Sequence, residues 1–198
     1  MPEFLLENID YVIAVFTTLF AIAGMQFKDM RIILVSQIIA NGLLGAQAIL
    51  GGTASASGIL FLAIIQTVIS FVFTYKSKDF PVWLTLLFAI GYTTITVICY
   101  ATPFDILTCI ASWFFAIAIV QKNSAVCRLC SLINLLLWLS YDIAVMPSGI
   151  INHTVIIAFV IVAIIRLDRE EWRGLGVVKI AAKDLYDGIR STFRSGKA

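Results

Sequence analysis

Four polar or aromatic residues recur on one side of an apolar stretch near residue 140. Asn134, Trp138, Tyr141 and Asp142 follow three- and four-residue spacing, so on a helix they form one stripe. An aromatic face packs against the ring carbons of a sugar or nucleoside, and amides bond to its hydroxyl groups. The stripe therefore indicates a polar cavity that opens outward. The alternative is hydrogen bonding between helices, worth about 0.6–2 kcal/mol per contact.

Other polar side chains interrupt the apolar segments. Asn152 and His153 open the last such segment, and Gln37 and Asn41, four residues apart, share one helix face. Asn41 is a further candidate for the cavity, whereas Gln37 and Gln66 are interpreted as contacts between helices.

Asp142 and His153 also form a candidate proton-titrating pair. Asp142 is expected close to the outer surface, where a hydrated carboxylate costs little, so proton coupling is not the favoured interpretation. Asp10 and Asp105 stand where helices are expected to begin, and helix capping explains them best.

The composition explains why these polar residues are informative. Hydrophobic residues make up 61% of the 198 residues, charged residues 13%, and the mean hydropathy is +0.99. A soluble domain of this size needs more charge to cover its surface, so the excess apolar surface must face lipid. The beginning of the chain is acidic, with Glu3 and Glu7, so the first apolar run is expected to be a permanent span and not a cleaved signal peptide.

Short polar or Gly/Pro-rich joints divide the chain into seven apolar runs. Each is about long enough to cross a hydrocarbon core of ~30 Å, and each must be helical because lone strands would leave backbone groups unpaired in lipid. The predicted spans are Ile9–Met25, Ile32–Leu50, Ser57–Tyr75, Phe80–Tyr100, Phe104–Val120, Leu129–Met146 and Gly149–Ile165. The expected fold is an all-α integral membrane protein of seven transmembrane helices.

The positions of the basic residues support this number. All 14 Lys and Arg residues fall in the first, third and fifth joints or after the seventh run, and the other joints have none. With seven spans, all of them lie on one side of the membrane, which the positive-inside rule makes cytoplasmic. The N-terminus is then expected outside and the C-terminus in the cytoplasm.

The two halves of the chain match at an offset of 95 residues, which brings Phe20–Gln26 onto Phe115–Gln121 and Asp10 onto Asp105. Runs 1–3 therefore resemble runs 5–7, and the fourth run gives both triplets the same orientation. This predicts a 3+1+3 parallel repeat of three-helix bundles, related by an axis along the membrane normal. The expected divisions are a first repeat at 1–79, a linker helix at 80–103, a second repeat at 104–167 and a tail at 168–198.

The tail reads as an amphipathic helix. Its apolar residues recur at helical spacing with charged residues between them: Leu175, Val178, Ala182, Leu185, Ile189 and Phe193. Such a helix suits either the anionic inner leaflet or the underside of the bundle, and the sequence does not choose between them.

The 3+1+3 plan resembles that of the SWEET and PQ-loop transporters. More closely, the last two runs look like the YgjV-type family of bacterial inner-membrane proteins, a likeness that covers nearly all of residues 9–166. The residues that carry it are Arg128–Asn134, Leu137–Asp142, Gly149–Thr154 and Ile164–Arg166.

The likeness to SWEETs implies a solute pocket between the bundles, lined by Trp138 and Asn152. The repeat mate of Asn152 is Ser57, so the pocket would be asymmetric. The PQ dipeptide that ends a first helix in that family keeps its glutamine here, at Gln26 and Gln121, which implies gating residues; its proline is absent.

These features favour a transporter of a sugar-like or other small polar solute that works by alternating access. The alternatives are a non-transporting receptor or assembly factor with the same fold, and a vitamin-precursor channel of the 3+1+3 type, which several pocket tryptophans would mark. One histidine, no nucleotide-binding loop and no HExxH motif give an enzyme little support. No cofactor, metal or nucleic acid is expected. The expected partners are the bilayer and a small solute, and a homo-oligomer is compatible with the sequence.

Overall fold

The computed structural model describes residues 9–145 and 147–168. Within them the chain forms seven α-helices and no strand, which confirms the all-helical prediction and the number of helices. A short 3-10 helix, η1 (Pro147–Gly149), precedes the last of them. The helices are α2 (Ile9–Met25), α3 (Met30–Leu50), α4 (Ala54–Tyr75), α5 (Val82–Ile98), α6 (Asp105–Ala118), α7 (Ser124–Ala144) and α8 (Ile150–Leu167). Of the tail predicted at 168–198, residues 169–198 lie outside the described residues.

Capping side chains explain where two of the helices begin. Asn123 accepts the backbone N–H of Ala125 at 2.8 Å, and α7 therefore begins at Ser124, earlier than the expected Leu129. Asp29 caps α3 in the same way. The earlier start of α7 places Arg128 inside the helix, whereas the sequence pattern put it in the preceding joint.

The helices carry their apolar side chains outward. Of the described helices, α3, α4, α7 and α8 are long and apolar enough to cross a membrane, while α2, α5 and α6 are apolar but shorter. Large apolar residues such as Ile98 and Ile151 are 77% and 75% exposed, whereas the polar Gln66 and Thr108 are fully buried. Large apolar side chains on the outside and polar side chains inside are the reverse of the usual distribution in a soluble protein. This distribution suits a surface in contact with lipid.

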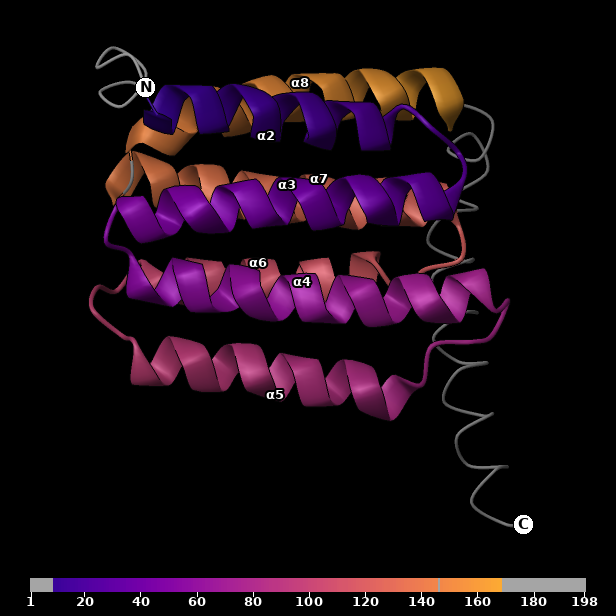
Figure 1. Ribbon diagram of the computed structural model, residues 1–198, viewed down its shortest axis with the longest axis horizontal. Helices are drawn as coiled ribbons and strands as arrows, with labels where there is room; N and C mark the ends of the chain where they lie inside the picture. The colour runs from indigo at the N-terminus through magenta and orange to yellow at the C-terminus, as the bar shows by residue number, and fades with distance from the viewer. Residues whose placement is uncertain (1–8, 146, 169–198) are drawn as a thin grey trace.

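The helices lie side by side in two layers (Figure 1). Each connection reverses the chain direction, and α2, α3, α4 and α5 follow one another from top to bottom of the view, with α8, α7 and α6 behind. The contacts close a ring, because α2 packs against α8 and α4 packs against α6. Helix α5 packs against α4 and α6 on the outside of that ring.

A buried hydrogen-bond chain attaches α5 to the ring. The Tyr92 hydroxyl donates to Gln66 Oε1 at 2.7 Å, and Gln66 Nε2 donates to the Ala116 carbonyl oxygen at 3.4 Å. These bonds join α5, α4 and α6, so the expected role of Gln66 in helix contacts is confirmed.

The described basic residues gather at one end of the bundle, because the α2–α3, α4–α5 and α6–α7 connections and the end of α8 meet there (Figure 1). They are Lys28, Arg31, Lys76, Lys78, Lys122, Arg128 and Arg166. This end is called the basic end below.

Two glycines on neighbouring helices test how tightly the ring is packed. A Cβ on Gly24 of α2 would lie 2.6 Å from the Ser36 Cβ of α3, whereas one on Gly42 would meet nothing within 4 Å. Both changes to alanine raise helix propensity equally. We therefore expect Gly24→Ala to be less stable than Gly42→Ala by about 1–3 kcal/mol, the usual cost of overpacking.

The measurement is thermal unfolding of the two purified variants in the same detergent. Equal midpoints would contradict a close α2–α3 crossing at this point.

Candidate functional site

A cavity of about 60 Å³ lies at the centre of the ring, lined by residues of α2, α3, α4, α6, α7 and α8. Helix α5 contributes no lining residue. Most of the wall is apolar, and the polar residues that interrupt it come from five of the six helices. They are Thr17, Gln37, Asn41, Ser112, Ser131, Asn134, Asn152 and His153.

Three asparagines give the cavity its hydrogen-bonding character. The side chains of Asn41, Asn134 and Asn152 come from α3, α7 and α8, and all three are buried. Asn41 Nδ2, Asn134 Oδ1 and Asn152 Nδ2 have no hydrogen-bond partner among the described residues. Buried amide atoms are costly when unpaired, so two donors and one acceptor in one cavity point to a polar molecule as their partner.

Two further lining residues differ in their contacts. Asn152 Oδ1 accepts a hydrogen bond from the Thr18 hydroxyl of α2, which leaves its Nδ2 free. Gln37 also lines the cavity and forms no hydrogen bond with a described residue. The expectation that Gln37 would bond to a neighbouring helix is therefore wrong.

Trp138 lies at the wall of the cavity and is 5% exposed. The His153 ring stacks with it at 6.1 Å between centroids and 18° between planes, and the Tyr141 ring meets it edge-on at 5.7 Å. Tyr141 is buried beside Trp138 but is not part of the cavity wall. Two aromatic neighbours thus hold the indole in place.

Asp142 lies deeper than the sequence pattern suggested. Its carboxylate is 0% exposed, and its Oδ2 contacts Nδ1 of His153. Helix α8 and η1 fold back over the end of α7, and Gly149 packs so closely that a Cβ there would collide with the carboxylate. The expectation of a hydrated Asp142 near the surface is therefore wrong, and the residue lies behind His153, outside the cavity wall.

Ser57 does not reach the cavity. Its hydroxyl donates to the Thr53 carbonyl oxygen at 2.7 Å, on its own helix. The neighbouring Ser55 instead donates to Asp105 Oδ1 at 2.7 Å, and the same carboxylate accepts the Thr102 N–H at 2.7 Å. Asp105 thus bonds to the loop before α6, as a capping residue would, and also ties α6 to α4.

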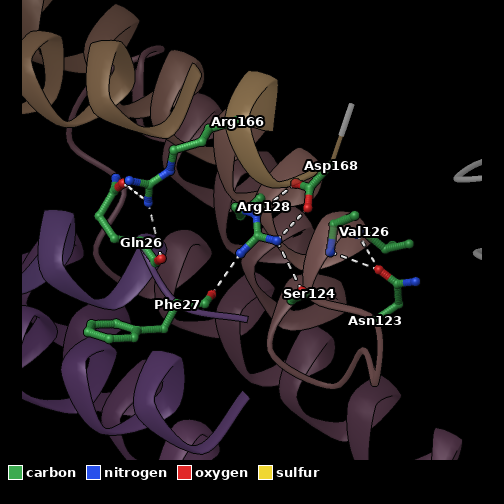
Figure 2. Close-up of polar contacts among 9 residues, drawn as sticks. Gln26, Phe27, Asn123, Ser124, Val126, Arg128, Arg166 and Asp168 are labelled. Carbon is green, nitrogen blue, oxygen red and sulfur yellow. Dashed lines mark hydrogen bonds and ion pairs between the residues drawn. The ribbon is translucent and has the colours of Figure 1, made fainter. Parts of the chain in front are cut away.

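At the basic end, Gln26 joins the first helix to the last (Figure 2). Its Oε1 accepts from Arg166 at 2.8 Å, and its Nε2 donates to the Phe159 carbonyl oxygen at 3.3 Å. Its repeat mate Gln121 donates to the Ile117 carbonyl oxygen of its own helix at 3.1 Å. Of the two glutamines, only Gln26 connects different helices through the contacts described.

A buried ion pair closes the same end. Arg128 Nε donates to Asp168 Oδ2 at 2.7 Å and Nη2 to Oδ1 at 2.5 Å, and both side chains are at most 1% exposed. Arg128 also donates to the Phe27 carbonyl oxygen at 2.8 Å and to the Ser124 hydroxyl at 3.0 Å (Figure 2). One guanidinium therefore holds α7, the end of α8 and the α2–α3 loop together.

The sequence pattern missed this cluster. It placed Arg128 in a cytoplasmic joint and Asp168 at the start of the tail, and it did not pair the two side chains, which are buried together. The available signal was a lone charge directly after Val126 and Cys127, within apolar sequence. A charge in that setting needs a partner.

A family model described as a bacterial inner membrane protein, Imp-YgjV, matches residues 8–171 of the chain. No curated protein and no solved structure matches the chain.

The unpaired cavity amides give a stability prediction. Asn134 forms no hydrogen bond with a described residue, so Asn134→Leu removes no bond and abolishes the cost of one buried, unpaired amide. We expect Asn134→Leu to raise the free energy of unfolding by about 1–3 kcal/mol. Thermal unfolding in detergent measures the shift, with Gln66→Leu as the control that must destabilise because Gln66 is bonded on both sides. A destabilised Asn134→Leu would show that Asn134 is a structural residue.

The buried ion pair gives a second prediction. Arg128→Ala leaves the Asp168 carboxylate buried without its partner, so we expect a loss of about 3–5 kcal/mol in stability. Lys122→Ala breaks the ion pair with Asp79, in which both side chains are exposed, and should change stability by about 0–1 kcal/mol. Thermal unfolding of both variants in one detergent compares them, and similar small losses would refute the role given to Arg128.

Proposed function

This chain belongs to the Imp-YgjV family of bacterial inner membrane proteins. From the geometry of its central cavity we propose that it carries a small, neutral, polar solute across the inner membrane. The observation that supports this most directly is the central cavity with unpaired amide atoms from Asn41, Asn134 and Asn152. Two donors and one acceptor match a hydroxylated or amide-bearing molecule.

The charge of the lining argues for a neutral solute. None of the described lining residues is Lys, Arg, Asp or Glu, and the one titratable member, His153, contacts Asp142 behind the wall. A charged solute would lose its hydration without gaining a counter-charge, which is costly in an apolar interior. Sugars and similar polyhydroxyl molecules meet this requirement.

The size of the cavity argues for movement. A volume of about 60 Å³ holds a few water molecules, whereas pockets that bind small molecules usually measure about 300–1,000 Å³. A sugar therefore enters only if the helices around the cavity move apart. In the proposed mechanism α2–α4 and α6–α8 rock against each other, so that the cavity opens to one side of the membrane at a time.

The packing supports a 3+1+3 repeat in this mechanism. Each triplet touches the other through its first and last helices, α2 against α8 and α6 against α4. Helix α5 lies outside the ring and lines no part of the cavity, as suits a linker. All seven helices would cross the bilayer. The basic end would face the cytoplasm and the N-terminus the periplasm, by the positive-inside rule.

In this orientation the contacts of Gln26 and Arg128 would form the inner gate. Gln26 bonds across the α2–α8 seam, and Arg128 ties the α2–α3 loop to α7 and to the end of α8. Opening toward the cytoplasm would require these bonds to break. Gln121 bonds within its own helix, which gives its proposed gating role less support.

Uptake into proteoliposomes tests the transport proposal. Radiolabelled hexoses, nucleosides and neutral amino acids are the probes, and we expect one class to accumulate in protein-containing vesicles. Asn152→Ala and Trp138→Ala should each lower the initial rate about tenfold, which corresponds to one lost contact of ~1.4 kcal/mol. Thr94→Ala is the control, because Thr94 is exposed on α5 and bonds to its own helix.

Uptake of none of these probes, together with specific capture of a protein partner that Trp138→Ala leaves intact, would favour the receptor or assembly-factor alternative. The channel alternative would be marked by several pocket tryptophans, and Trp138 is the single tryptophan among the described lining residues.

A further inference from the structure

Asp142 and His153 form a titratable unit behind the wall of the cavity. The Asp142 carboxylate is fully buried, its Oδ2 contacts His153 Nδ1, and its Oδ1 has no hydrogen-bond partner among the described residues. Gly149 covers the carboxylate so closely that no larger residue fits there. The imidazole is therefore the one described group placed to balance a negative charge on Asp142.

Among the described residues, the surroundings of Asp142 offer no other positive charge. On α7 the titratable neighbour is Tyr141, which also interacts electrostatically with Asp105 of α6. Asp105 is held by Ser55 and by backbone N–H groups of its own loop. The described Lys and Arg residues lie at the basic end, and Asp142 stands near the opposite end of α7.

His153 connects this carboxylate to the cavity. Its Nδ1 faces Asp142, its ring lines the cavity and stacks with Trp138, and its Nε2 forms no hydrogen bond with any described residue. A proton can thus reach Nε2 from water in the cavity while Nδ1 stays with the carboxylate. In that step an N–H bond forms at Nε2, an O–H bond of hydronium breaks, and a water molecule leaves.

We propose that Asp142 and His153 form a proton-binding site whose occupancy is coupled to the opening of the cavity. Without the extra proton the pair carries a negative charge, which a closed cavity of about 60 Å³ solvates poorly. With it the pair is a neutral imidazolium–carboxylate pair. Proton binding therefore favours the closed cavity, and a wet, open cavity favours release. The link to solute movement rests on the proposed function, whereas the site itself does not.

Trp138 is a built-in reporter of this proton, because a charge that appears on the stacked imidazole changes indole emission. Replacing Trp83, Trp113 and Trp172 by Phe leaves Trp138 as the one tryptophan. In lipid nanodiscs, with an affinity tag free of histidine, we expect the emission to change reversibly when the pH is lowered and then restored. His153→Gln should abolish that change. A chain that keeps Trp113 instead is the control and should show none, because its indole bonds to Thr93 on α5.

A second measurement needs no substitution. The chain has one histidine, so selectively labelled histidine gives a single imidazole NMR signal that should shift reversibly with the same change of pH. A flat Trp138 emission together with an invariant histidine signal over the whole pH range in which the protein stays folded would overturn the proposed site.

The coupling is tested in proteoliposomes with an imposed pH gradient and the same radiolabelled probes. We expect the gradient to change the uptake rate of the wild-type chain, and Asp142→Asn to lose that response. An uptake rate of the wild-type chain that is the same with and without the pH gradient would overturn the proposed coupling. A pH-dependent Trp138 emission without uptake of any probe would support the proton site and refute the transport proposal. The proton site and the transport proposal can therefore be refuted independently.

Discussion

Hydrocarbon offers no hydrogen-bond partner, and this constraint decides which polar side chains of the chain remain able to bind a ligand. Many Ser and Thr residues satisfy themselves within their own helices, as Thr17 does with the Ile13 carbonyl oxygen and Thr67 with that of Ala63. An asparagine amide offers four hydrogen-bonding positions, which its own helix does not fill, so it depends on groups from elsewhere. Three of the buried side-chain atoms without a partner among the described residues belong to asparagines, and all three of these asparagines line the cavity.

The same constraint explains where charges are tolerated. The buried carboxylates and guanidinium that the structure describes lie toward the ends of helices, each with a dedicated partner: Arg128 with Asp168, Asp142 with His153, and Asp105 with Ser55. Between these ends the cavity wall holds amides and hydroxyl groups, and His153 is its one titratable member among the described residues. The molecule thus separates charges that fasten helices together from neutral groups able to meet a ligand.

The sequence predicts the number and approximate bounds of the helices well, because each depends on the length of an apolar run and on the short polar joint that ends it. Three- and four-residue spacing also places Asn134 and Trp138 on one helix face, and both line the cavity, as does Asn152, which the family resemblance supplied. Depth is harder to predict. Asp142 follows the same stripe as Trp138, yet α8 and η1 fold over it, and that contact depends on residues that the spacing does not describe.

Pairing between distant residues is harder still. Forty positions separate Arg128 from Asp168, and the sequence pattern places them in different segments with nothing to connect them. Ser57 illustrates the same limit on a smaller scale, because the repeat places it opposite Asn152, while its hydroxyl turns back to Thr53. Periodicity specifies the face of a helix, and the packing of the other helices decides what that face meets.

The bidentate geometry of Arg128 and Asp168 has an electrical consequence. A single charge that crosses the whole membrane field exchanges about 2.3 kcal/mol per 100 mV. A guanidinium and a carboxylate that stay joined form a dipole of zero net charge, so a displacement of the pair as one body is almost insensitive to membrane voltage. Membrane voltage would therefore act on the Arg128–Asp168 pair only when its two partners separate along the field. The voltage would favour or oppose the breaking of the pair, and would have little effect on where the joined pair lies.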